Sequence, residues 1–62
     1  MIANDQELKT TQQRVAQFQA WLEQIRATAR AEEFEAMAGG YRLEIERMQA
    51  DVLDYLLRPV AA

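Results

Sequence analysis

Cysteine, histidine and serine are all absent from this chain, so the search for chemistry begins with its carboxylates and its two tyrosines. Without those three types, no familiar pair of nucleophile and base can be assembled. Carboxylates do occur close together, as Glu32 with Glu33 and Glu44 with Glu46. Neighbouring and alternate side chains on a helix diverge, however, so these acids do not converge on one substrate atom. The sequence predicts no catalytic residue and no enzyme activity.

The same inventory bears on metals and cofactors. Thiolate and imidazole ligands are missing, which leaves only carboxylate oxygens as ligands. Glu23 and Glu44 are spaced to meet at the rim of a helix pair, but opposed carboxylates there are normally solvated. A carboxylate di-metal site in a helical bundle also needs histidines, and no glycine-rich loop follows a strand to hold phosphate. We predict no metal and no cofactor.

Charge and hydropathy limit the classes of partner that the chain is expected to bind. Ten acidic and seven basic residues give a net charge of −3, and the two signs are interleaved along the 62 residues. Binding to nucleic acid needs clustered Lys and Arg, so we expect no direct contact with DNA or RNA. No apolar run approaches the ~20 residues of a membrane span, and the first residues do not resemble a secretory signal. With no cysteine, these features favour a cytoplasmic protein.

What remains is association between apolar surfaces, and the apolar residues follow two heptad ladders. The first ladder consists of Leu8, Thr11, Val15, Phe18, Leu22, Ile25 and Ala29. The second consists of Ala31, Phe34, Ala38, Tyr41, Ile45, Met48, Val52 and Tyr55. Alternating steps of three and four place each ladder along one stripe of a helix, as in helices that pack side by side. We therefore expect the ring of each tyrosine to lie in the core and its hydroxyl to lie at the rim.

The phase of the pattern breaks once, at residues 28–30. Two stripes joined by a short reversal predict an all-α fold, a two-helix antiparallel hairpin that forms one domain over residues 1–62. The helices are expected at about 5–28 and 31–57. In this register Phe18 lies beside Tyr41 and Val15 lies beside Ile45.

Residues near the expected helix ends support these bounds. Asn4 followed by Glu7 resembles a capping box, and Pro59 prevents the second helix from continuing. Basic Arg26 and Arg30 give way to acidic residues after the break, which matches the two helix dipoles. On the second helix, Arg42 can pair with Glu46 and Asp54 with Arg58, four residues apart.

The only two glycines offer an alternative position for the turn. Gly39 and Gly40 are adjacent, and each glycine costs a helix interior ~1 kcal/mol relative to alanine. The second ladder passes through them without losing phase, so we place the reversal at 28–30. A kink at the glycines stays open, and the proposed turn contains no Gly, Pro or Asn.

Several apolar residues are left outside the two ladders, and contiguous apolar surface usually marks an interface. The glycines point away from the intramolecular seam, where small residues let another backbone approach. The predicted interface residues are Trp21, Met37, Gly39, Gly40, Leu53, Leu56 and Leu57. A chain this short has a small core, so we expect a homodimer in which two hairpins form a four-helix bundle.

The opening segment Met1–Glu7, the ladder around Phe18 and the segment from Glu44 to Tyr55 resemble the helical N-terminal segment of HigA-type bacterial antitoxins. A helix-turn-helix DNA-binding domain follows in that family. It does not follow in these 62 residues, so no DNA-binding residue carries over. The resemblance implies an oligomerisation or partner-docking element in the bacterial cytoplasm.

Two functions follow from the sequence. The first is a non-catalytic helical-hairpin module for self-association or protein interaction. The alternative is a small antitoxin-like regulatory protein that binds a toxin or a DNA-binding partner.

Overall fold

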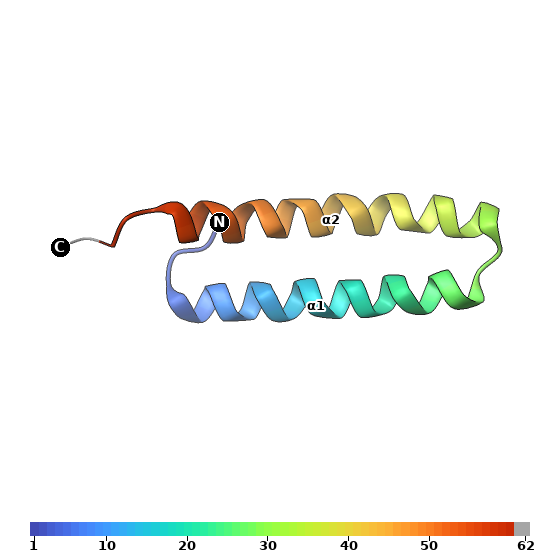
Figure 1. Cartoon of the computed structure of the whole chain (residues 1–62), viewed down its shortest axis with the longest axis horizontal. Coiled ribbons are helices and arrows are strands. Elements are labelled where there is room, and N and C mark those ends of the chain that lie inside the picture. The colour runs from blue at the N-terminus through green and yellow to red at the C-terminus, as the bar shows by residue number, and fades with distance from the viewer. Residues whose placement is uncertain (61–62) are drawn as a thin grey trace.

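The computed structural model describes residues 1–60, which form two antiparallel helices. Helix α1 spans Asp5–Thr28 and helix α2 spans Ala31–Leu57, and they lie side by side along a rod of 52 × 15 × 12 Å (Figure 1). The expected helix bounds are confirmed, while Ala61 and Ala62 of the expected domain lie outside the described residues. Over residues 1–60, neither helix has a stretch long and apolar enough to cross a membrane.

The turn between the helices consists of Ala29 and Arg30, both in extended conformation. Their φ/ψ angles are −84/154° and −68/155°, which any residue adopts, so the turn needs no glycine. The Ala29 N–H donates to the carbonyl of Ile25 at 2.8 Å, and the Phe34 N–H donates to that of Arg30 at 2.7 Å. The reversal predicted at residues 28–30 is therefore confirmed.

Gly39 and Gly40 lie inside α2, which is helical on both sides of them. Neither glycine has a positive φ, and a Cβ added at either would meet nothing within 4 Å. The alternative of a turn at the glycines is wrong, because the heptad phase carries the helix through them.

The seam between the helices follows the two ladders. Every ladder residue except Ala31, which is exposed, is at least partly buried. The ring of Phe18 meets the ring of Tyr41 edge-on, with centroids 5.8 Å apart, as the predicted register requires. Seam burial is shallow because a pair of helices covers only one side of each stripe.

Only two of the described residues are more than nine-tenths buried, namely Ile2 at 3% exposure and Met48 at 7%. Ile2 belongs to the segment Met1–Ala3, here called the N-terminal arm, which crosses the open end of the hairpin from α1 to α2 (Figure 1). The arm ends at the cap of α1, where the Glu7 N–H donates to Asn4 Oδ1 at 2.9 Å. Glu7 in turn accepts from the Ala3 N–H at 2.8 Å, one residue before the cap.

Candidate interaction surface

The hairpin has two long faces, one on each side of the plane through α1 and α2. The arm face carries the N-terminal arm and a shallow hollow lined by Met1, Thr10, Arg14, Arg47 and Asp51, among others. The groove face carries two hollows between the helices. Its lining residues are Gln12, Val15, Gln19, Leu22, Phe34, Glu35, Ala38, Gly39, Arg42, Ile45, Glu46, Gln49, Val52, Leu53 and Leu56.

The N-terminal arm covers the arm face near the open end. Arg58 Nη2 donates to the Ile2 carbonyl at 2.7 Å, and the Met1 ammonium lies 3.6 Å from an Asp51 oxygen. These contacts hold the arm against α2 and place the Ile2 side chain in the most buried position among residues 1–60. Arg58 thus contacts the arm, and no ion pair joins it to Asp54 within residues 1–60, so the predicted Asp54–Arg58 pair is not formed.

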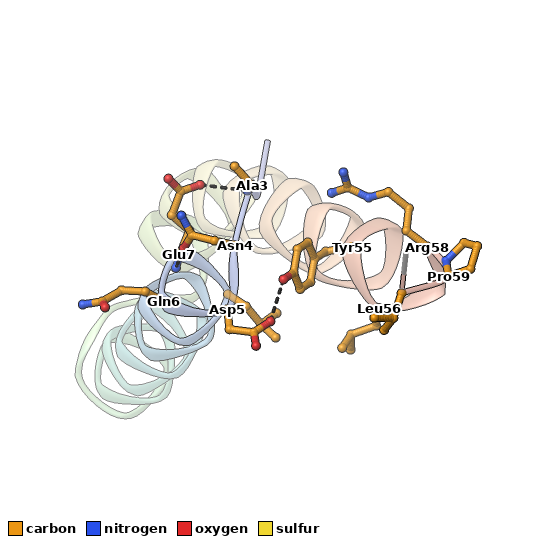
Figure 2. Close-up of a pocket in the computed structure, with 11 residues that line it drawn as sticks. Ala3, Asn4, Asp5, Gln6, Glu7, Tyr55, Leu56, Arg58 and Pro59 are labelled. Atoms are coloured by element: carbon orange, nitrogen blue, oxygen red, sulfur yellow. Dashed lines mark hydrogen bonds between the residues drawn. The ribbon is translucent and has the colours of Figure 1, made fainter. Parts of the chain in front are cut away.

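Tyr55 joins the two helices at the open end. Its hydroxyl donates to Asp5 Oδ1 at 2.6 Å, and the two side chains point toward one another (Figure 2). The Arg58 guanidinium carbon lies 5.2 Å from the centroid of the Tyr55 ring, within the range of a cation–π contact.

The environment of Tyr55 opposes its use as a nucleophile or base. The hydrogen bond to Asp5, together with burial and the Asp5 charge, raises the pKa of the Tyr55 phenol above its ordinary value. An activated tyrosine needs the opposite shift. The hollow around this pair, lined by residues such as Ala3, Asn4 and Leu56 (Figure 2), is a structural junction between the chain ends.

Trp21 and Met37 lie on the half of the arm face near the turn. Trp21 follows Arg14 by two helical turns, and Met37 precedes Glu44 by two turns, and both Arg14 and Glu44 line the arm face. The Trp21 ring packs against Phe18 with centroids 5.3 Å apart. It therefore already has a partner within the chain, and its remaining exposure is 42%.

The groove face has no covering segment among the described residues. One hollow, near the turn, is lined by Leu22, Phe34 and Ala38. The other, near the open end, is lined by Val15, Val52 and a pair of exposed leucines, Leu53 and Leu56. Gln49 borders both hollows, so they adjoin one another along the hairpin, and together they are called the groove.

The structure divides the predicted interface residues between sides of the hairpin. Gly39, Leu53 and Leu56 line the groove face. Trp21, Met37 and Gly40 lie toward the arm face, Gly40 because it precedes Arg47 by two turns. Leu57 lies on the outer side of α2, four turns after Leu43, and both leucines are exposed.

Two features of these faces are not predicted from the sequence. Ile2 was missed because it precedes the first helix, where heptad periodicity gives no signal. The uncharged stripe of Gln12 and Gln19 on α1 was also missed, although its heptad spacing beside Val15 and Leu22 was visible.

Charged side chains on the two faces pair mainly within α2. Arg42 Nε donates to Glu46 Oε1 at 2.6 Å on the groove face, which confirms the predicted pair. Arg47 lies 3.8 Å from Glu44 on the arm face. No group of three or more metal-ligating side chains converges within residues 1–60.

Comparisons with known protein families, curated proteins and solved structures find no match to this chain.

Proposed function

We propose that the chain is a non-catalytic self-association module, a helical hairpin that pairs with a second copy to form a four-helix bundle. The proposal is supported mainly by the amount of surface that the single hairpin leaves exposed. Its accessible surface is 5232 Å².

That surface is large for the size of the chain. A compact monomer of the same 7.2 kDa mass exposes about 4,100 Å² by the scaling of surface with mass. The excess is about 1,100 Å², and a standard protein interface buries about 800 Å² on each partner. A single face-to-face contact between two hairpins would remove an excess of this size.

The composition of the exposed surface supports the same function. Leu53, Leu56 and Leu57 are all more than half exposed, and each fully buried leucine side chain contributes about 1.5–3 kcal/mol. Ile2 and Met48 alone provide a deeply buried core among the described residues, which is little for a domain of this length. A second copy supplies the missing layer.

The test is the mass of the purified chain in solution. Light scattering over a range of micromolar concentrations should give about twice the 7.2 kDa chain mass. A monomer throughout this range would overturn the proposal and favour binding to a different protein, as the antitoxin-like alternative requires.

A further inference from the structure

We propose that the second copy docks on the groove face and runs in the opposite direction. The two-fold axis would be perpendicular to the helices and would lie between the two groove faces, at the level of Val15 and Ile45. Each helix of one copy would then lie over the same helix of the other copy. The inference rests on the proposed function and names the surface and the orientation of the pairing.

The choice of face follows from what each face already contacts. On the arm face, the N-terminal arm covers the open end, and Trp21 packs against Phe18 in the half near the turn. Trp21 and Met37 are 42% and 44% exposed, whereas Leu53 and Leu56 on the groove face are 57% and 58% exposed. The leucines of the groove face therefore keep a larger fraction of each side chain uncovered, and they lie beside two adjoining hollows.

Charge on α2 is self-complementary about the proposed axis. Arg42 and Glu46 lie on either side of it, so Arg42 of one copy would lie opposite Glu46 of the other. Their mutual ion pair leaves both side chains more than half exposed, so each can also contact the second copy. An isologous interface requires this kind of self-matching surface.

The α1 side of the groove matches about the same axis. Since Phe18 meets Tyr41, Val15 lies level with Ile45 one helical turn further along, and an axis at this level passes midway between Gln12 and Gln19. Gln12 of one copy would therefore lie opposite Gln19 of the other. A primary amide both donates and accepts hydrogen bonds, so these side chains can pair across the interface with no buried charge left unpaired.

At each end of the groove, the leucines of one copy reach the hollow of the other. Rotation about this axis brings Leu53 and Leu56 level with Glu35 and Glu32 of the other copy, so the leucine side chains would lie over the hollow near its turn, which Phe34 also lines. It also brings Gln49 level with Gly39, where the space beyond the backbone is open. The exposed leucines of each copy would cover the uncovered hollow of the other.

Cysteine cross-linking tests the arrangement, because the natural chain has no cysteine. Gln12→Cys and Gln19→Cys variants are mixed, refolded together and oxidised gently, and the products are identified by mass spectrometry. The mixed 12–19 disulfide should predominate. A 12–12 or 19–19 link would span seven residues, about 10 Å along the helix axis, which exceeds the ~7 Å reach of a disulfide.

Two further mixtures serve as controls. Thr10→Cys with Gln17→Cys has the same spacing on the same helix, but Thr10 lines the arm face, and little product is expected. Gln12→Cys with Gln49→Cys would link copies that run in the same direction, since both residues line one hollow. Circular dichroism checks that every variant keeps its helices.

The outcomes separate the two proposals. A monomeric natural chain overturns the proposed function and this inference together. A dimer that links through 10–17 or 12–49, or that fails to link through 12–19, overturns this inference and leaves self-association standing. A dimer linked mainly through 12–19 supports both.

Discussion

The two faces of the hairpin share one seam yet differ in what covers them. On the arm face, the N-terminal arm buries Ile2 and joins α2 through Arg58 and Asp51. On the groove face, no described segment covers Leu53 and Leu56. The comparison teaches that the chain itself covers one end of the arm face, whereas the described residues leave the groove face uncovered, and this is the face on which we propose that a second copy docks.

The largest expected effect comes from charge on the groove face. Replacing both Leu53 and Leu56 by Glu should weaken dimerisation by about 3 kcal/mol or more, because two buried leucines are lost and two carboxylates are desolvated. Sedimentation equilibrium measures the change in dissociation constant. The control variant Trp21→Glu places one such charge on the arm face and should leave the dimer intact. A dimer lost in Trp21→Glu and kept in the double variant would reverse the roles of the faces.

The second largest effect is expected on the free energy of unfolding, when the segment that covers the arm face is weakened. Ile2→Ala should lower the free energy of unfolding by about 2 kcal/mol, because a side chain only 3% exposed is truncated. Urea denaturation at fixed protein concentration measures it. Leu43→Ala, at an exposed position on the outer side of α2, should change the free energy by less than about 0.5 kcal/mol. Equal losses for both variants would show that the arm does not complete the core.

The adjacent glycines sharpen the comparison, because they lie toward different faces. Gly40→Ala should stabilise α2 by about 1 kcal/mol through helix propensity alone, since a Cβ there meets nothing. Gly39→Ala brings the same helical gain but adds a methyl group at the proposed contact with Gln49. It should therefore weaken dimerisation relative to Gly40→Ala, as measured by the dissociation constants. Identical dissociation constants would remove Gly39 from the interface.

The smallest expected effect is on the pH dependence of stability, which involves Tyr55 at the open end. The pKa of Tyr55 is raised by its hydrogen bond to Asp5, so the folded state holds the phenolic proton more tightly than the unfolded state. This stabilisation is complete below pH ~10, the ordinary tyrosine pKa, and is lost as the pH rises through the raised value. Tyr55→Phe should flatten the alkaline fall in melting temperature, and phenolate absorbance gives the titration. An unchanged alkaline profile in Tyr55→Phe would contradict the assignment.

The helices and their seam were predictable because local rules agreed along the chain. The heptad phase, the cap at Asn4 and the break before Ala31 all pointed to the bounds observed for α1 and α2. The same phase showed that Gly39 and Gly40 lie within a helix, although glycine usually marks a turn. The turn residues were less expected, since Ala29 and Arg30 need only extended backbone and carry no turn signature.

The surface was harder to predict than the seam. Trp21 and Leu56 both flank the ladders, and hydrophobicity alone does not tell one flank from the other. The heptad positions of Trp21 and Leu56 do distinguish the flanks, because in this antiparallel pair equivalent heptad positions of α1 and α2 lie on the same face. Ile2 is different, because its burial depends on Arg58 and α2 at the other end of the sequence. No pattern local to residues 1–4 indicates that contact.

The contact between the arm and α2 sets an order of assembly. Ile2 and Arg58 are 56 positions apart, and Asp5 and Tyr55 are 50 apart, whereas the bend at Ala29 joins neighbours. Short loops close at lower entropic cost than long ones, so the helices should zip from the bend toward their free ends. During synthesis residues 1–3 are made before their docking site on α2. Their arrival on Arg58 therefore marks a hairpin that has closed along the whole length of its two helices.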